Sequence, residues 1–228
     1  MEDRHVLVQL DNGLLGAIFD GHRGSSVADL AADTFADLYH HARSSFPEEQ
    51  SRLVAALAAI PNREITGGAC AVSFHLSGSE LAVANVGDCE LAWAGDDGTN
   101  LLLTVKHGLA NEQERHRVQR AGAIVAPPYF FNPATGQGLM PTRSLGDHDL
   151  EGVGLIHMAA SVSMILSPPG WIVGACDGLW DVMRAGELPG LLFGAAGADD
   201  AVQRLSHEAL DVRRTGDNLT IIVVRVGL

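Results

Sequence analysis

Four aspartates in this chain stand at the ends of short apolar runs. They are Asp20, Asp88, Asp177 and Asp217. The first three follow an apolar run, in the sequences Phe-Asp-Gly, Val-Gly-Asp and Cys-Asp-Gly, and the fourth precedes one, in the sequence Asp-Asn-Leu-Thr. In antiparallel strands, the start of one strand lies beside the end of its neighbour. The spacing therefore predicts four carboxylates at one edge of a set of sheets.

Carboxylates that share a site repel one another, and their pKa values rise as a result. A bound cation removes the repulsion, and a set of oxygen ligands selects Mg²⁺ or Mn²⁺ over Zn²⁺. Two such ions about 4 Å apart would generate a hydroxide nucleophile and hold a phosphate for in-line displacement. The adjacent glycines would let a carbonyl group or a phosphate approach closely. Each Asp-Gly pair taken alone is more often a simple turn, so both interpretations stay open at this point.

Apolar runs separated by turn residues predict the strands that would carry these aspartates. Three hairpins are expected, with strands over residues 6–10 and 14–19, 70–76 and 80–86, and 90–94 and 101–104. Two later runs, at 171–176 and 219–226, are rich in β-branched residues and also predict strands.

Helical periodicity appears between the hairpins. Helices are expected over residues 27–38, 48–60, 111–121 and 201–210. Ser25 or Ser26 would cap the first helix, and the sequence from Asn111 to Glu114 resembles a capping box, with Gly122 ending that helix. Pairs of helices between hairpins predict an α+β fold with antiparallel sheets inside and helices outside. Neither a repeat nor a linker divides the sequence, so a single domain over 1–228 is expected.

Composition narrows the class of protein. Hydrophobic residues make up 46% of the 228 residues, enough for a core, and the formal net charge of −13 disfavours nucleic acid and anionic membranes as partners. The apolar runs are far shorter than the roughly 20 residues that span a bilayer, and the acidic N-terminus is unlike a secretion signal. Cys70, Cys89 and Cys176 are widely spaced and odd in number, which predicts reduced thiols. We expect a cytoplasmic monomer.

Six segments of the chain resemble, in order, the motifs of the PPM family, the type-2C metal-dependent protein phosphatases. The segments are Met1–His5, Phe19–Gly24, Ala84–Asp88, Thr142–Asp147, Cys176–Asp181 and Asp217–Thr220. One tetrapeptide would be weak evidence, but six motifs in family order over nearly the whole chain are highly specific. The resemblance implies a four-layer α-β-β-α sandwich of two antiparallel sheets flanked by helices. It also implies hydrolysis of phosphoserine and phosphothreonine in proteins, by attack of a metal-bridging hydroxide on phosphorus.

The resemblance also implies a role for each matched residue. The implied metal ligands are Glu2, Asp20, Gly21, Asp88, Asp177 and Asp217. Asp20 would bridge two divalent cations, Mn²⁺ or Mg²⁺. One cation would bind Glu2 and the Gly21 carbonyl group, and the other would bind Asp177 and Asp217. Asp88 and Asp177 would hold a weaker third ion.

Three further residues would act around the ions. Asp3 would orient metal-bound water, and Asn218 would stand beside the ligand Asp217. His22 matches the histidine proposed in the family as the general acid that protonates the leaving seryl or threonyl oxygen. One histidine among ten in the chain is also compatible with a plain turn residue, but its place directly after Asp20-Gly21 favours the catalytic role.

The chain departs from the family pattern in three places. The family's phosphate-binding arginine lies four residues before the glutamate, a position that falls before residue 1, so the substrate-binding residues stay unknown. Either the natural start lies upstream or the arginine is missing, and its loss predicts weaker phosphate binding. Gly67-Gly68-Ala69 replaces the usual Gly-Ser-Thr, which we expect to be harmless. Residues 126–138 lie where the family has a flap, and we expect them to govern substrate access.

Two other functions compete with the phosphatase. A pseudophosphatase would keep the fold as a binding module, and the missing arginine is compatible with that. The retained Asp20, Asp177 and Asp217 argue against it, because loss of these ligands is the usual route to inactivity. A two-metal hydrolase acting on small phosphate esters is the third possibility, and the family order of the motifs disfavours it.

Overall fold

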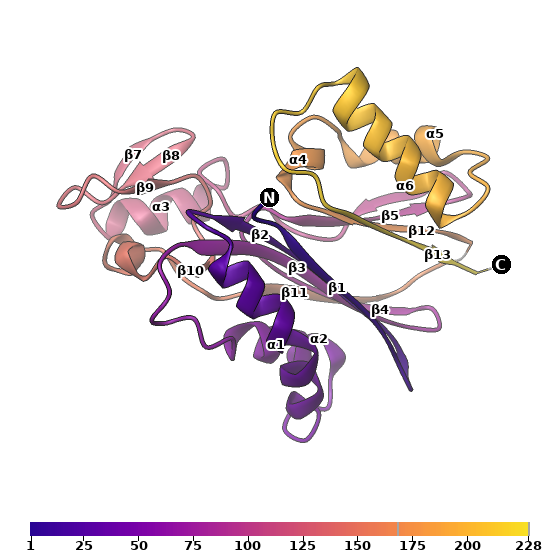
Figure 1. The fold of residues 1–228 in the computed structure, drawn as a ribbon, viewed down its shortest axis with the longest axis horizontal. Coiled ribbons are helices and arrows are strands. Elements are labelled where there is room, and N and C mark those ends of the chain that lie inside the picture. Colours follow the sequence, from indigo (N-terminus) through magenta and orange to yellow (C-terminus); the bar gives the residue numbers. More distant parts are fainter. Residues whose placement is uncertain (168, 228) are drawn as a thin grey trace.

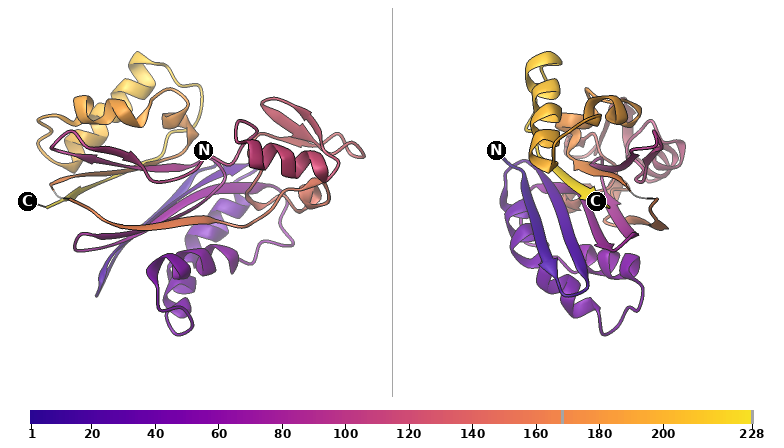
Figure 2. Two further views of the ribbon diagram at one scale, coloured as in Figure 1. Left: turned by 180° about the vertical axis from the view of Figure 1, so that it is seen from behind. Right: turned by 90° about the vertical axis from the view of Figure 1, so that its right-hand side faces the viewer.

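Two antiparallel sheets stack face to face, and helices cover both outer faces (Figure 1; Figure 2 gives two further views). The computed structural model describes residues 1–167 and 169–227, so the last residue of the predicted domain lies outside the described part. The layers run from one helix pair through the two sheets to a second group of helices. The predicted α+β sandwich of four layers is confirmed.

The first sheet has the strand order β1-β2-β3-β4-β11, and β10 also pairs with β3. Its strands are β1 (Arg4–Leu10), β2 (Gly13–His22), β3 (Gly68–Ser77), β4 (Glu80–Val86), β10 (Leu145–Gly146) and β11 (Ala160–Ile165). The second sheet has the order β13-β12-β5-β6. Its strands are β5 (Glu90–Gly95), β6 (Asn100–Leu102), β12 (Gly170–Ala175) and β13 (Ile221–Val226).

The helices lie on opposite outer faces of the sandwich. The first sheet is covered by α1 (Ser26–Ala42) and α2 (Glu49–Ala58). The second is covered by α4 (Asp177–Trp180), η2 (Ala185–Glu187), α5 (Leu188–Leu192), α6 (Ala198–His207) and η3 (Glu208–Val212).

A smaller unit lies to one side of the sandwich, at the left of Figure 1. It consists of α3 (Glu112–Arg120), the three-stranded sheet β7 (Ile124–Ala126), β8 (Tyr129–Phe131) and β9 (Gly138–Leu139), and η1 (His148–Val153). Its own apolar cluster is centred on Val118, Phe130 and Leu150, which are fully buried. The predicted flap segment therefore has regular structure, and it folds against α3.

Strand residues alternate in size between the two faces of each sheet. Along β3, Cys70, Val72 and Phe74 face the other sheet, whereas Ala69 and Ala71 face α1 and α2. In β5, Leu91 and Trp93 likewise fill the space between the sheets, and the alanines between them face the helices. Successive side chains of a strand point to opposite faces, so this pattern places large side chains between the sheets. Both faces of β3 and β5 are buried, one by the other sheet and one by helices, so the sequences of these strands are almost continuously apolar.

All three predicted hairpins are present, as β1-β2, β3-β4 and β5-β6. The predicted boundaries need correction by one to three residues in every predicted strand except β4. Among the largest changes, β2 runs on to His22 instead of ending at Phe19, β6 ends at Leu102 instead of Thr104, and β13 begins at Ile221 instead of Leu219. The extension of β2 follows from its pairing with β3, which continues to the pair His22 and Gly68.

The predicted cap of α1 and the predicted capping box of α3 also differ from the structure. Ser25 precedes α1, but its hydroxyl group donates to the Asp29 carboxylate, at 2.8 Å, and does not cap the helix backbone. Asn111 caps α3 as predicted, accepting from the amides of Gln113 and Glu114. The Glu114 carboxylate does not complete a capping box, because it accepts hydrogen bonds from Arg143, Arg117 and Thr142. Within the described residues, the helices are all too short or too polar to cross a membrane.

Candidate active site

Asp20 and Asp177 meet at one end of the sandwich although they belong to different sheets. Asp20 lies near the end of β2, opposite Cys70 of β3, and Asp177 is the first residue of α4, directly after β12. Ligand atoms of Asp20, Cys176 and Asp177 all lie within 4.8 Å of one another. The predicted meeting of strand-end aspartates is therefore found for this pair.

Three more aspartates surround the pair. Burial raises the pKa of Asp20, and the nearby Asp177, Asp3 and Asp88 raise it further. The pKa of Asp177 is raised by burial and then by Asp88 and Asp217. Without a bound cation, these carboxylates destabilise the folded protein, because their charged forms repel one another. We call these five residues the acidic cluster.

The donor set of the acidic cluster fits a hard divalent cation. Asp3 is 4% exposed, and its Oδ1 is buried with no hydrogen-bond partner among the described residues. Its Oδ2 accepts from Thr220 Oγ1 at 2.8 Å, which fixes the carboxylate. An unpartnered buried oxygen beside repelling carboxylates is what a cation with bound water would satisfy. The residues present therefore fit the predicted Mg²⁺ or Mn²⁺ centre.

Glu2 is held beside this end of the sheets from three directions. Its backbone amide donates to Asn218 Oδ1 at 2.9 Å, and its Oε1 accepts from the Gly24 amide at 2.5 Å. A Cβ atom added to Gly21 would lie 2.6 Å from the Glu2 carbonyl oxygen. Pairing of β1 with β2 from Arg4 onward holds the chain near its first residues. The Glu2 carboxylate itself contacts the loop after β2, not the Asp20–Asp177 pair.

The segment that carries Asp217 packs tightly over α4. A Cβ atom on Gly178 would lie 1.9 Å from the Asn218 carbonyl oxygen, so only glycine fits there. Cys176 accepts from the Thr220 amide at 3.2 Å and donates to the Asn218 carbonyl oxygen at 3.4 Å. Burial raises the pKa of this thiol, which keeps it protonated as a structural group. The exposed Asp217 is thereby brought beside Asp177.

His22 is paired with a residue to which the sequence analysis gave no role. Its Nε2 lies 2.6 Å from Asp147 Oδ2, which also accepts from Ser144 Oγ at 2.6 Å. Arg23 donates to Asp147 Oδ1 at 2.5 Å. Burial alone would raise the pKa of Asp147, but these hydrogen bonds hold it below its ordinary value. The signal was available, since Asp147 closes one of the six matched motifs.

Gly68 makes room for that pair. A Cβ atom there would lie 2.1 Å from Asp147 Oδ2 and 2.6 Å from His22 Nε2. The glycine that replaces serine in the family pattern is therefore required by the contact between His22 and Asp147 in this chain. The expectation that this replacement is without consequence is not supported by the geometry.

Lys106 is the only lysine of the chain, and it lies at the rim of the acidic cluster. Its Nζ is 2.6 Å from Asp181 Oδ1. Burial would lower its pKa, but Asp181, Asp88 and Glu90 raise it above the ordinary value. A cation of the protein itself thus stands beside Asp88, where the resemblance implies a third metal ion. None of the six matched motifs contains this residue.

Arg4 and Arg23, which lie near the site, are engaged in ion pairs. Arg4 Nε lies 2.5 Å from Asp29 Oδ1, and Arg23 forms two bonds to Asp149 besides its bond to Asp147. Arg23 also donates to Gln137 of the segment before β9, at 2.8 Å, so the predicted flap touches the rim of the site. A groove of about 300 Å³ follows this rim, lined by residues that include Arg23, Arg63, Gln137 and Asp149.

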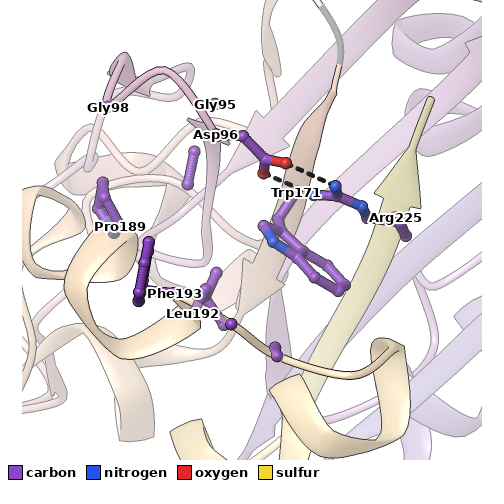
Figure 3. Close-up of a pocket in the computed structure, with 11 residues that line it drawn as sticks. Gly95, Asp96, Gly98, Trp171, Pro189, Leu192, Phe193 and Arg225 are labelled. Carbon is purple, nitrogen blue, oxygen red and sulfur yellow. Dashed lines mark hydrogen bonds and ion pairs between the residues drawn. The ribbon is translucent and has the colours of Figure 1, made fainter. Parts of the chain in front are cut away.

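A second pocket lies at the opposite end of the second sheet (Figure 3). Its volume is about 410 Å³, and Trp171, at the start of β12, lines it. Arg225 stacks 4.6 Å from the centre of the Trp171 ring and bonds with both oxygens of Asp96 at 2.6 Å. Asp177 follows the other end of β12, so the pocket lies a strand length away from the acidic cluster.

A family model described as protein phosphatase 2C matches residues 1–219. The chain therefore belongs to the protein phosphatase 2C family, which confirms the resemblance inferred from the six motifs. The chain is 30% identical to the protein kinase and PP2C-like domain-containing protein of Arabidopsis thaliana, over 98% of this chain and 37% of the relative. It is 28% identical to the mitochondrial protein phosphatase 1K of Xenopus laevis, over 99% of this chain and 64% of the relative. The chain thus spans less than two thirds of these two relatives.

Solved structures agree on the fold. The serine-threonine phosphatase 2C from Toxoplasma gondii superimposes with a TM-score of 0.82 at 19% identity, over 98% of this chain and 90% of that one. A C. elegans sex determining protein superimposes with a TM-score of 0.83 at 22% identity, over 97% of this chain and 60% of that one. At these identities the likeness establishes the four-layer fold.

Proposed function

We propose that this chain is a metal-dependent protein phosphatase that hydrolyses phosphoserine and phosphothreonine, within one catalytic domain. The observation that carries the proposal is the acidic cluster, in a chain of the protein phosphatase 2C family. Phosphorylated proteins are the proposed substrates. The cytoplasmic location and the monomeric state remain predictions from the sequence.

The acidic cluster and its neighbours would hold two divalent cations, Mn²⁺ or Mg²⁺. Asp20 would bridge them, with Glu2 and the Gly21 carbonyl group on one side and Asp177 and Asp217 on the other. When bound, the two cations lower the pKa of a water molecule and polarise the phosphate oxygens. Support comes from the raised pKa values of Asp20 and Asp177, because a site that disfavours bare carboxylates is stabilised by positive charge.

Asp3 and Asn218 would support this centre from just outside it. The unpartnered Oδ1 of Asp3 is available to accept from a water on a cation, and Thr220 fixes its other oxygen. Asn218 ties the Glu2 backbone to the segment that carries Asp217. Glu2 would reach a cation by exchanging its hydrogen bond with the Gly24 amide for the metal.

His22 would donate a proton to the leaving seryl or threonyl oxygen. A general acid must be held in one orientation and within reach of the atom that it protonates. Asp147 supplies the orientation through its contact with His22 Nε2, and Ser144 and Arg23 hold Asp147 in turn. Asp147 is therefore proposed as a positioning residue for His22.

The third ion implied at Asp88 and Asp177 would compete with Lys106. The ammonium group of Lys106 already offers positive charge to Asp88, Asp181 and Glu90. A divalent cation entering beside Asp88 would meet repulsion from that charge. We therefore propose that two ions bind well and that the third binds weakly.

The test is phosphate release from a phosphothreonine peptide with Mn²⁺, with Mg²⁺ and with EDTA. Asp177→Asn keeps the shape of the side chain and removes its charge, and it should lower release by about 100-fold or more. Asp199→Asn is the matched control, because Asp199 is exposed on α6 and belongs to neither candidate metal group. Phosphate release that requires Mn²⁺ or Mg²⁺, and that EDTA abolishes, supports the proposal.

Failure to release phosphate with either metal, from a folded protein, would favour the pseudophosphatase. Release from a small aryl phosphate but not from any phosphopeptide would favour a small-molecule hydrolase. Release that persists in EDTA and in Asp177→Asn would contradict the two-metal centre.

A further inference from the structure

A second group of metal-ligating side chains lies outside the acidic cluster. His148 and Glu151 stand one turn apart on η1, and His157 follows before β11. One ligand atom from each of the three lies within 4.8 Å of the others. Glu151 Oε1 is 2.6 Å from His148 Nδ1 and 2.9 Å from His157 Nε2. We call these three residues the imidazole cluster.

In each imidazole ring, the nitrogen that points away from Glu151 (the outer nitrogen) contacts an oxygen acceptor, and the other (the inner nitrogen) faces Glu151. His157 Nδ1 lies 2.8 Å from the Ser144 carbonyl oxygen, which can only accept a hydrogen bond, so Nδ1 carries the proton. His148 Nε2 lies 2.9 Å from Asn62 Oδ1, and it too acts as the donor. In the neutral rings, the lone pairs of both inner nitrogens then point at the same carboxylate oxygen. That arrangement is repulsive unless a cation or additional protons lie between the three atoms.

We propose that the imidazole cluster binds a transition-metal ion of the Zn²⁺ class. Two imidazoles and one carboxylate select such an ion over Mg²⁺, and three protein ligands leave a position for water. In each ring, one nitrogen donates its proton to an amide or carbonyl oxygen, and this hydrogen bond orients the other nitrogen as a metal ligand. Around a tetrahedral ion with bonds of about 2.0–2.1 Å, ligand atoms stand roughly 3.3 Å apart, so the Glu151 oxygen must move away from each ring nitrogen by less than about 1 Å. All three side chains are partly exposed, which gives the ion a path.

The cluster is connected to the proposed active site through η1. Asp147 directly precedes η1 and contacts His22, and Asp149 lies on η1 and pairs with Arg23. Ser144 bonds with both sides, since its hydroxyl group donates to Asp147 and its carbonyl oxygen accepts from His157. An ion bound to the cluster would therefore hold η1 in the position that orients His22. This bracing role rests on the proposed function, whereas the metal site does not.

The test is a calorimetric titration with Zn²⁺ in a large excess of Mg²⁺, so that Mg²⁺ fills the oxygen ligands of the acidic cluster. The wild-type protein should bind one equivalent of Zn²⁺. His157→Gln and Glu151→Gln should each weaken this binding by at least about tenfold. His207→Gln is the matched control, because His207 pairs with Asp211 at 2.9 Å on an exposed surface and belongs to no candidate metal group within the described residues. Two ligand variants guard against one of them failing to fold.

Hydrogen exchange then tests whether a bound ion holds η1 in place. Backbone amides of η1 should exchange more slowly when Zn²⁺ is bound. Separately, Co²⁺ in place of Zn²⁺ should give the visible absorption of a site with nitrogen ligands. Equal Zn²⁺ binding by wild type and both ligand variants would overturn the metal site, because the ion would then lie in the acidic cluster. Binding without any change in exchange of η1 would overturn the brace alone. If the wild-type protein binds Zn²⁺ at the imidazole cluster but releases no phosphate, the proposed function is contradicted and the metal site is still supported.

Discussion

The acidic cluster and the imidazole cluster gather ligand atoms in opposite ways. Asp3, Asp20, Asp88, Asp177 and Asp217 come from five segments spread over most of the chain, and they meet because two sheets stack. The imidazole cluster comes from ten consecutive residues on and after η1. The first depends on the whole sandwich, whereas the second depends on one short helix and the loop behind it.

The clusters also differ in donor chemistry. The acidic cluster offers only carboxylates, of which Asp3 and Asp88 are buried and Asp20 and Asp177 half-buried, and their mutual repulsion favours a hard cation. The imidazole cluster offers two partly exposed rings and one carboxylate, which favour a borderline ion. We therefore expect the acidic cluster to bind Mn²⁺ or Mg²⁺ and the imidazole cluster to bind Zn²⁺. The following experiments test this difference.

Asp20→Asn should separate the clusters most strongly. In EDTA the variant should melt at a higher temperature than the wild type, because one repelling carboxylate is gone. Mn²⁺ at about one hundred times its Kd stabilises a protein by about 2.7 kcal/mol, and this gain should be lost in the variant. Thermal unfolding with and without Mn²⁺ measures both effects. The Zn²⁺ equivalent should be retained, and an unchanged Mn²⁺ gain would contradict the role of Asp20.

Gly68→Ala tests the link between the clusters, since Asp147 stands between them. The added methyl group would overlap Asp147 Oδ2 and His22 Nε2, so the positioning contact should break. We expect kcat to fall by about 10- to 100-fold with the fold retained. Gly186→Ala is the control, because a Cβ atom there meets nothing within 4 Å. An unchanged kcat would show that Asp147 does not position His22.

The pH dependence of stability without metal reports on the acidic cluster alone. The pKa of Asp20 is raised in the folded state, so the folded protein holds a proton that the unfolded chain releases above about pH 4. Folded Asp20 therefore lowers stability increasingly as the pH rises toward its raised pKa. Lowered pKa values of His75 and His107 act only below about pH 6.5. The raised pKa values of the three buried thiols begin to act as the pH approaches the ordinary thiol value of about 8.5, so pH 7 to 8 is the clean window. The urea midpoint in EDTA should fall there for the wild type and stay flatter for Asp20→Asn; the same slope in both proteins would argue against the raised pKa.

Lys106→Met should have the smallest effect. Removing the ammonium group beside Asp88 and Asp181 should tighten the weakest Mn²⁺ binding event several-fold, because the incoming ion no longer meets a like charge. Lys106→Arg keeps the charge and serves as the control. Calorimetry with Mn²⁺ measures the change, and weaker binding in Lys106→Met would mean that the lysine assists the ion instead of competing with it.

Much of the fold was readable from the sequence because its signals are local. Hairpins around Asn12-Gly13, Gly78 and Gly98 formed as predicted, since turn residues between apolar runs specify them. The exact strand ends were not readable, because β2 continues to His22 only where β3 supplies a partner. The capping box failed for a similar reason: Glu114 has stronger partners in Arg143 and Arg117, which come from outside its own turn.

The sequence by itself predicted that Asp20, Asp88, Asp177 and Asp217 gather at one end of an α+β fold, because motif order and apolar periodicity are properties of the chain alone. Only the tertiary structure decided that Asp20 and Asp177 meet across two sheets, that Gly68 leaves space for His22 and Asp147, and that Lys106 stands beside Asp88. It also placed His157 beside His148 and Glu151. The physical reason is that distances between side chains depend on how the layers stack, and residue spacing along a chain does not specify that stacking.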